Sequence, residues 1–238
     1  MAMVVFGAAG GLGLALTEKL HATYPEQQII AISRKPVSKR LAGVNYVTVG
    51  DYSDATLAEW ASDFKKSGGQ LDGVISTVGM LHDDSTFPEK QLTDINPEDL
   101  EKLFHVNAIT PLLILKHCQT LFDKKQAAFF VQLSAKVGSI EDNYLGGWYS
   151  YRASKAALNM LLKTASIELK RSHKQLIVAA IHPGTTDTGL SKPFQKRVPK
   201  DKLYSAEQSA ERILSVIREL EPAQSGSLFH WDGTRLPY

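Results

Sequence analysis

Cysteine is almost absent from this sequence, since Cys118 is the only one among 238 residues. One cysteine forms neither an internal disulfide nor a cysteine-based zinc cluster, so we expect a reducing, cytoplasmic environment. Excess charge of one sign is also lacking, because 27 Lys and Arg oppose 25 Asp and Glu. A formal net charge of +2 provides no overall field that attracts nucleic acid or an anionic membrane. These absences favour a protein that acts on a small molecule and binds neither nucleic acid nor membrane.

Long apolar segments are lacking too, although the first 17 residues carry no charge. Such a start is found in signal peptides and membrane anchors. Here no Lys or Arg precedes it, and it is shorter than the ~20 residues that a membrane helix needs. It also contains four glycines, at positions 7, 10, 11 and 13. We therefore expect no targeting segment and look for another role for these glycines.

The composition is that of an ordinary globular domain, with 43% hydrophobic and 22% charged residues. This apolar content and the low net charge argue against disorder. No repeat, low-complexity segment or Pro/Ser-rich linker divides the chain. We expect a single domain over residues 1–238.

Short apolar segments without polar alternation predict buried strands, and the longer segments between them predict helices. Strands are expected at residues 3–6, 28–33, 44–49, 73–77, 127–133, 176–181 and 226–230. Helices are expected at residues 11–24, 54–67, 96–121, 149–170 and 205–220, with Asn96 and Ser205 as caps. Strands that alternate with helices predict an α/β fold, a doubly wound Rossmann-type domain with a parallel sheet of about seven strands and helices on both faces.

A glycine-rich turn separates the first predicted strand from the first predicted helix. Gly7, Gly11 and Gly13 follow the spacing GxxxGxG. Glycines let the backbone approach a phosphate closely, and free N–H groups at a helix start face the anion. A Walker A loop is excluded because it needs Gly-Lys where this chain has Leu12-Gly13. The turn predicts a dinucleotide site, with tight helix packing as the alternative reason for the glycines.

The second predicted strand ends at Ser33, and Arg34 and Lys35 follow. An NAD-binding domain places a carboxylate here for the ribose 2′-hydroxyl. Residues 34–40 (RKPVSKR) instead contain four cations and no acid. A guanidinium binds a 2′-phosphate through charge-assisted hydrogen bonds, so the sequence favours NADP(H) over NAD(H). The alternative is a solvated basic turn.

Tyr151 and Lys155 are four residues apart at the start of a predicted helix and therefore share one of its faces. An ammonium beside a phenol lowers the phenol pKa, which would suit Tyr151 to exchange a proton with a carbonyl or alcohol oxygen. Such pairs are frequent on helix surfaces, so the spacing alone does not distinguish a catalytic pair from a surface pair. Their position after the fifth predicted strand favours the catalytic interpretation.

Four motifs occur in the order and spacing of the short-chain dehydrogenase/reductase family, which the chain resembles over essentially its whole length. They are FGAAGGLG at 6–13, VNA at 106–108, YRASK at 151–155 and PGTTDT at 183–188. The segments GSIEDNYLGGWYSYRASKAALN and FHWDGTRLPY are similar to its C-factor-like and carbonyl reductase branch.

The resemblance implies an NADP(H)-dependent oxidoreductase that interconverts a carbonyl and an alcohol on a small molecule. Tyr151 would be the catalytic acid/base, and Lys155 would hold the nicotinamide ribose and depress the tyrosine pKa. Asn107, in a locally kinked helix, would support a water in a proton relay. The alternative is a catalytically weak dinucleotide-binding signalling or regulatory protein of the C-factor type.

The resemblance also implies a set of cofactor-binding residues in the glycine turn and after the strands. Asp51 would bind the adenine edge, and Pro183-Gly184 would shape the nicotinamide pocket. Thr186 and Thr188 would lie near the carboxamide and a phosphate. The full set is Gly7, Gly11, Leu12, Gly13, Ser33, Arg34, Lys35, Asp51, Tyr52, Thr77, Gly79, Lys155, Pro183, Gly184, Thr186 and Thr188.

The sequence departs from the family at the usual catalytic serine, whose position is occupied by Ala135. Ser134 is the preferred replacement, although a local bulge would be needed to direct its hydroxyl to the substrate. Ser139 is the second candidate. STVG at residues 76–79 stands where the family has Asn-Asn-Ala-Gly, so the turn there must be stabilised differently.

Several further expectations concern the surroundings of the site. The resemblance implies a homodimer or homotetramer formed through helices 96–121 and 149–170. Residues 190–204 should cover the substrate pocket, but they carry no signature of the substrate. Trp148 either lines this pocket or packs in the helix, and His182 is expected to be a packed or pocket-lining residue rather than a base. No histidine spacing predicts a metal site.

Overall fold

The computed structural model describes residues 1–238 and contains an eight-stranded sheet of order β10-β9-β6-β5-β4-β1-β2-β3. Seven neighbouring strands are parallel, and only β10 is antiparallel to its neighbour β9. The strands are β1 Ala2–Phe6, β2 Gln28–Ser33, β3 Val44–Thr48, β4 Leu71–Ser76, β5 Ala128–Leu133, β6 Leu176–His182, β9 Leu228–His230 and β10 Arg235–Leu236. The predicted parallel α/β sheet is confirmed.

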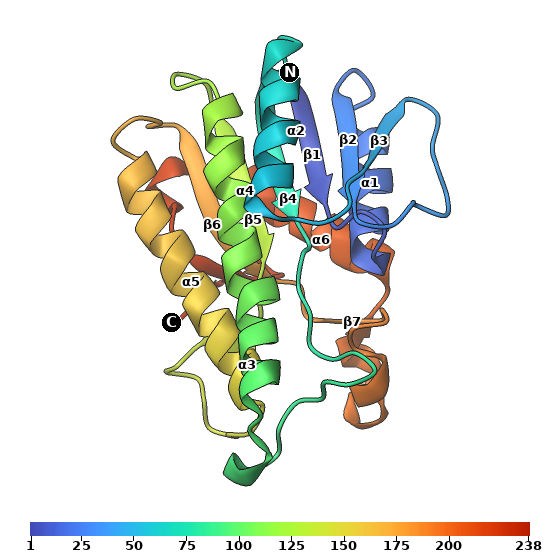
Figure 1. Cartoon of the computed structure of the whole chain (residues 1–238), viewed down its shortest axis with the longest axis vertical. Helices are drawn as coiled ribbons and strands as arrows, with labels where there is room; N and C mark the ends of the chain where they lie inside the picture. The colour runs from blue at the N-terminus through green and yellow to red at the C-terminus, as the bar shows by residue number, and fades with distance from the viewer.

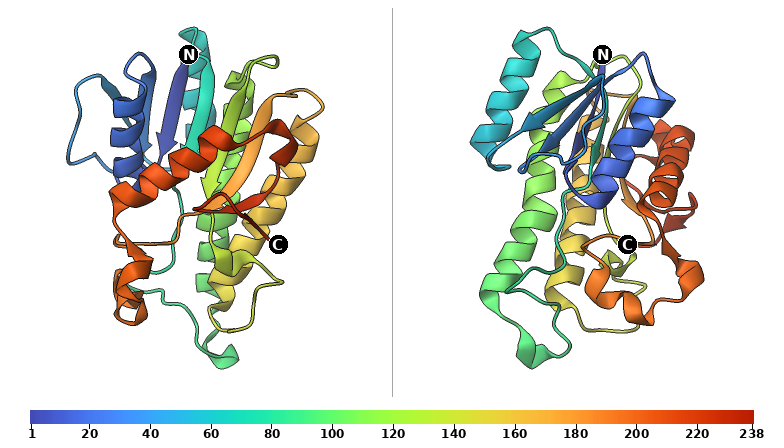
Figure 2. Two further views of the ribbon diagram at one scale, coloured as in Figure 1. Left: turned by 180° about the vertical axis from the view of Figure 1, so that it is seen from behind. Right: turned by 90° about the vertical axis from the view of Figure 1, so that its right-hand side faces the viewer.

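Helices cover both faces of this sheet, as the right-hand view of Figure 2 shows. Helices α1 and α6 pack against each other on one face, and α2, α4 and α5 lie on the other. The helices are α1 Gly11–Thr23, α2 Asp54–Lys66, α3 Pro97–Phe104, α4 Thr110–Cys118, α5 Tyr149–Leu169 and α6 Ala206–Glu219. None of them is both long and apolar enough to cross a membrane.

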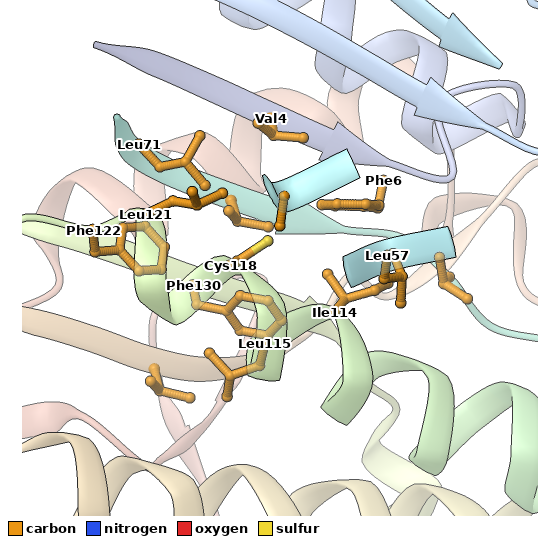
Figure 3. Close-up of a cluster of buried hydrophobic side chains, with 14 of the residues drawn as sticks. Val4, Phe6, Leu57, Leu71, Ile114, Leu115, Cys118, Leu121, Phe122 and Phe130 are labelled. Atoms are coloured by element: carbon orange, nitrogen blue, oxygen red, sulfur yellow. The ribbon is translucent and has the colours of Figure 1, made fainter. Parts of the chain in front are cut away.

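Each face of the sheet has its own apolar core. On the α2/α4/α5 face, Phe6 and Phe130 meet Leu57 and Ile114 from the covering helices (Figure 3). Cys118 is fully buried among these side chains, and burial raises the pKa of its thiol. The thiol is therefore a core group, as the sequence predicted.

The predicted helix over residues 96–121 is interrupted. Asn96 caps α3 as expected, with its Oδ1 accepting from the Glu98 N–H at 2.8 Å. A π-helical segment, His105–Ile109, then separates α3 from α4. Its cause is Pro111, which has no N–H for the carbonyl of Asn107 and whose ring would clash with it in a regular α-helix. The expected local irregularity of the helix at Asn107 is therefore a π-helical segment.

Three short strands in the last quarter of the chain, β7, β8 and β10, were not predicted from the sequence. β10 returns after a turn at Gly233 (φ 86°) and pairs with β9. A second sheet consists of β7 (Thr185–Thr186) and β8 (Leu203–Tyr204). Two residues are too few to show a strand periodicity, so these elements could not be recognised from the pattern.

Candidate active site

The arrows of β1, β4 and β5 in Figure 1 point toward the lower half of the molecule, and several predicted site residues directly follow the ends of these strands. There α3 and the first turns of α5 extend beyond the sheet, and the chain after β4 and after β7 passes beside them. In a doubly wound sheet, ligands bind at the carboxyl ends of the strands. This edge is therefore the candidate site.

The glycine turn between β1 and α1 leaves no room for side chains. Gly7 has φ 81°, and a Cβ on Gly13 would lie 2.3 Å from the Gly7 carbonyl oxygen. Gly10, at the N-cap of α1, supplies no side-chain cap, and the first turn holds no acidic residue. Thr188 lies beside this turn, since a Cβ on Gly11 would be 3.1 Å from its methyl group. The N–H groups at the start of α1 and the close backbone fit the pyrophosphate of a dinucleotide.

The turn after β4 is stabilised by its own Thr77 and by two side chains from other elements. Thr77 Oγ1 donates to the Phe6 carbonyl at 3.0 Å, and Gln132 Nε2 donates to the Val78 carbonyl at 2.9 Å. Asn107 accepts from the Met80 N–H at 2.7 Å and donates to the Met80 carbonyl at 2.8 Å. These contacts explain how STVG replaces the usual family sequence.

Tyr52 connects the end of β2 to the glycine turn. Its hydroxyl accepts from the Gly7 N–H at 3.2 Å and donates to the Ile32 carbonyl at 3.3 Å. The Arg34 guanidinium carbon lies 5.9 Å from the centre of its ring. Burial raises the pKa of Tyr52, so the phenol stays protonated and structural.

Asp51 is exposed after β3, where its Oδ1 accepts from the Ser53 N–H at 2.9 Å and from Thr56 Oγ1 at 2.7 Å. These hydrogen bonds lower the pKa of Asp51, so the side chain is a carboxylate at neutral pH. Ser33 donates through Oγ to the Lys35 carbonyl at 2.6 Å. Both side chains thus shape the turns at the expected adenosine end of the site.

The four cations of residues 34–40 do not form one cluster. Lys39 Nζ is 2.8 Å from Glu18 Oε1, and the Arg40 guanidinium carbon is 5.1 Å from the Tyr46 ring centre. Arg34 and Lys35 remain beside the end of β2. Of the four cations, only this pair directly follows β2.

Tyr151, Lys155 and Asn107 are brought together from α5 and the π-helical segment. Lys155 Nζ lies 5.9 Å from the Tyr151 ring centre and donates to the Leu133 carbonyl at 3.1 Å. A Cβ on Gly79 would lie 3.2 Å from this Nζ and 3.4 Å from Asn107 Oδ1. Gly79 therefore gives Lys155 its space, and the three polar side chains form one buried group.

The protonation states differ from the sequence-based expectation. Burial raises the pKa of Tyr151 above its usual range and lowers the pKa of Lys155 to about 8. The expectation that Lys155 depresses the tyrosine pKa is not met in this arrangement, because burial of the phenol moves its pKa in the opposite direction. At neutral pH the Tyr151 hydroxyl keeps its proton and is a potential acid.

Neither candidate serine forms a hydrogen bond with Tyr151. Ser134 continues the ladder of β5, donating its N–H to the Ile181 carbonyl at 2.8 Å, and its Oγ donates to Asn159 Oδ1 at 2.8 Å. The bulge that a catalytic Ser134 required is therefore absent. Ser139 Oγ accepts from the Asp142 N–H at 3.1 Å. Ala135 itself packs with Tyr151, so the usual serine position is occupied by a methyl group.

Residues 182–186 continue from β6 beside the site. Gly184 has φ 78°, and a Cβ there would lie 2.9 Å from the Trp231 ring. Thr186 Oγ1 shares a hydrogen bond of 2.8 Å with Ser209 Oγ of α6, so its hydroxyl holds the segment in place. The His182 ring carries a buried, unpartnered Nδ1, and burial lowers its pKa to about 3. His182 is therefore neutral, as expected of a pocket residue.

Glu89 is a site residue that the sequence analysis missed. Its buried carboxylate accepts from the Ser150 N–H at 3.2 Å and from the Ser150 hydroxyl. Its backbone carbonyl accepts from the Trp148 N–H at 2.6 Å. It therefore caps α5, whose N-cap residue Trp148 offers no side-chain cap. No local pattern could reveal this contact, because 61 residues separate the partners.

Comparison with known proteins gives relatives over the whole chain. The 1-hydroxy-2-glutathionyl-2-methyl-3-butene dehydrogenase of Rhodococcus sp. (strain AD45) is 27% identical over 238 residues, 99% of each chain. The C-signal protein of Myxococcus xanthus is 30% identical over 147 residues, 62% of this chain and 83% of that protein.

Solved structures share the fold. The carbonyl reductase Sniffer of D. melanogaster has a TM-score of 0.84 at 21% identity, covering 100% of this chain and 99% of the other. The NADPH-bound carbonyl reductase from chicken fatty liver has a TM-score of 0.83 at 24% identity, covering 100% and 98%.

The family model described as short chain dehydrogenase matches residues 1–199. This match confirms the family predicted from the four motifs and covers the glycine turn, the π-helical segment and the Tyr151–Lys155 pair. The chain belongs to the short-chain dehydrogenase/reductase family of oxidoreductases.

Proposed function

We propose that this protein is an NADP(H)-dependent oxidoreductase that converts a carbonyl group of a small molecule into an alcohol. The observation that carries the proposal is the buried, protonated Tyr151 beside Lys155, at the same sheet edge as the glycine turn. The NADPH in the chicken carbonyl reductase, whose fold is similar, supports the choice of cofactor.

The residues present fit this dinucleotide. The glycine turn and the N-terminus of α1 would hold the pyrophosphate, with Thr188 beside them. Arg34 and Lys35 would bind the 2′-phosphate, and no acidic residue lies between 34 and 40 to repel it. Lys155 would reach the nicotinamide ribose. When bound, the reduced nicotinamide supplies the hydride for the carbonyl carbon.

Tyr151 would give its hydroxyl proton to the carbonyl oxygen. Hydride and proton together reduce the carbonyl to the alcohol and leave the dinucleotide oxidised. The tyrosinate formed would be stabilised by the Lys155 ammonium, which would also return a proton. The Asn107 carbonyl lacks the N–H of Pro111 and would accept a hydrogen bond from a water that supplies Lys155.

Ala135 favours a second candidate function. Without a serine hydroxyl, Tyr151 would be the only side chain that donates to the substrate oxygen. A protein that binds the dinucleotide and has little turnover, with a signalling or regulatory role, is consistent with this loss. The similarity to C-signal of Myxococcus xanthus over 62% of the chain also supports this second function.

One assay separates the two functions. Purified protein would be mixed with NADPH and a panel of aldehydes, ketones and quinones, and NADPH oxidation and alcohol formation would be followed together. If the protein is an oxidoreductase, NADP+ and alcohol should form in equal amounts with at least one of the substrates. Tight NADPH binding without oxidation by any carbonyl supports the regulatory function instead.

We also propose that the protein forms a homodimer or homotetramer through the two long helical stretches at residues 96–121 and 149–170. Ile109, Met160 and Ile167 are 45%, 65% and 54% exposed there, which is costly for apolar side chains on a monomer. Light scattering after gel filtration would report the mass, and a monomer at all concentrations would contradict this assembly.

A further inference from the structure

Three consecutive residues before Tyr149 have left-handed backbones. Gly146 and Gly147 both have φ 64°, and Trp148, at φ 53°, is the only non-glycine residue in the chain with a positive φ. The left-handed region is unfavourable for a bulky side chain and persists only where surrounding contacts enforce it. Here the Trp148 N–H donates to the Glu89 carbonyl at 2.6 Å, and Arg152 Nε donates to the Gly147 carbonyl at 3.0 Å. These hydrogen bonds hold Trp148 in a backbone conformation that is otherwise unfavourable.

This turn directs the Trp148 indole to the catalytic tyrosine. The indole meets the Tyr151 ring edge-on, with centroids 6.1 Å apart, and its centroid is 5.1 Å from that of Phe194. Phe194 belongs to the 3-10 segment Lys192–Arg197 within residues 190–204. The strained backbone therefore places an aromatic ring directly against the proposed proton donor.

Further rings extend this surface. Phe194 lies 5.7 Å from His82 and 6.4 Å from Phe87, and those two rings stack at 5.4 Å. His82 Nε2 also hydrogen-bonds to the Gly189 carbonyl at 3.2 Å, joining the chain after β4 to the segment of Phe194. We call His82, Phe87, Trp148 and Phe194 the aromatic wall.

The space beside the wall is apolar. Tyr151 packs with Leu81, Leu103 and Ala135, which contribute only hydrocarbon. Asp83, which follows His82 in the chain, is paired with Lys102 at 2.5 Å, so the charges of these two side chains offset each other. A substrate that reaches the Tyr151 hydroxyl from this side would therefore meet aromatic rings and hydrocarbon side chains.

We propose that the aromatic wall selects carbonyl compounds whose carbonyl is attached to a flat aromatic ring, and that this ring lies between Trp148 and Phe194. The proposal rests on the oxidoreductase function and names its substrate class. Because the Trp148 and Phe194 rings already touch at 5.1 Å between centroids, Phe194 would move aside to admit the substrate ring. The contacts of Phe194 with Trp148 would then be replaced by contacts of both rings with the substrate, which keeps the exchange close to balanced.

The test compares benzaldehyde with cyclohexanecarboxaldehyde, which have the same carbon skeleton but differ in flatness. Because their intrinsic reactivities differ, the quantity of interest is the change in the ratio of their kcat/KM values on substitution, with NADPH as reductant. We expect Phe194→Leu and Trp148→Leu each to lower the aromatic-to-aliphatic ratio about 5- to 10-fold, the worth of one ring–ring contact.

Tyr144→Leu is the matched control, since Tyr144 lies in the same loop, is 85% exposed and makes no contact with the wall. This variant should keep the wild-type ratio. Trp148→Phe keeps an aromatic ring and should keep most of the preference, which protects the test if Trp148→Leu folds poorly. An unchanged ratio in Phe194→Leu would overturn the proposal and leave the wall with a structural role.

A second readout separates this proposal from the proposed function. Binding of the two aldehydes to the complex with NADP+ would be measured by tryptophan fluorescence. If the protein reduces neither aldehyde but binds benzaldehyde more tightly, and Phe194→Leu removes this preference, the wall proposal stands and the reductase function fails. Equal binding of both aldehydes in the wild-type protein would overturn the wall proposal.

Discussion

The two sides of the site are built in different ways. The cofactor side consists of backbone groups and glycines in one short segment, residues 7–13, supported by Thr77 and Tyr52. The substrate side consists of side chains from three separate segments that meet at Trp148 and Phe194. The first is therefore visible as a motif, whereas the second exists only after folding. We therefore expect substitutions on the cofactor side to impair binding strongly, and substitutions on the substrate side to change substrate preference while the fold is kept.

The largest effect on cofactor binding is expected for Gly13→Ala. The added Cβ would lie 2.3 Å from the Gly7 carbonyl oxygen, so α1 must move away from the phosphate position. We expect the Kd for NADPH to rise by about two orders of magnitude or more, measured by fluorescence titration. Gly189→Ala, on the substrate side, has open space around its Cβ and should leave this Kd within about twofold. Tight NADPH binding by Gly13→Ala would contradict the claim that the cofactor side has no room for an added side chain.

Lys155 lies between the two sides, and its burial makes stability depend on pH. Its pKa is lowered from 10.5 to about 8, so above pH 8 the folded protein loses a proton that the unfolded chain keeps up to about pH 10.5. Stability should therefore rise with pH in this window, by up to about 1.4 kcal/mol per pH unit.

Lys155→Met isolates this contribution. At pH 7 the variant should be more stable than wild type, because it no longer buries an ammonium, and the difference should shrink as the pH approaches 10. Urea unfolding at several pH values measures it. A wild-type stability that falls between pH 8 and 10 relative to the variant would contradict the assigned direction.

Arg34→Asp sharpens the account of the cofactor side. Loss of a charge-assisted hydrogen bond to the 2′-phosphate, and the new repulsion, should reduce the preference for NADPH over NADH about 10- to 100-fold. Lys39→Asp is the control, because Lys39 is paired with Glu18 and should not contribute. Dissociation constants for both dinucleotides give the ratio. Equal affinities in the wild-type protein would disprove the 2′-phosphate assignment.

Ala135→Ser should have the smallest effect and the opposite sign. A hydroxyl at this position would lie against Tyr151 and add a donor for the substrate oxygen, raising kcat/KM by up to about tenfold. Ser134→Ala should leave activity unchanged but lower stability by about 1–3 kcal/mol, because Asn159 loses its partner. A loss of activity in Ser134→Ala would restore the serine as a catalytic group.

The part of the molecule that was predictable is the part with local signals. The bounds of β2 were predicted to the residue, and the caps Asn96 and Ser205 were correct, because strand composition and capping act over a few residues. Ser134 was misjudged because the direction of its hydroxyl depends on Asn159, 25 residues away. The pKa of Tyr151 was misjudged because burial is a property of the whole fold, whereas the sequence shows only the neighbouring charge. Glu89 and Phe194 had no signal at all, since their partners come from distant segments.

The most direct test of the central claim is the turnover of Tyr151→Phe. This variant keeps the ring and its packing but has no proton to give, so NADPH oxidation by a carbonyl substrate should fall about 10²- to 10⁴-fold. The Kd for NADPH should stay within about twofold of the wild-type value, because the glycine turn, Arg34 and Lys155 are untouched. Wild-type turnover by Tyr151→Phe would contradict the account, because another group would then have to protonate the substrate.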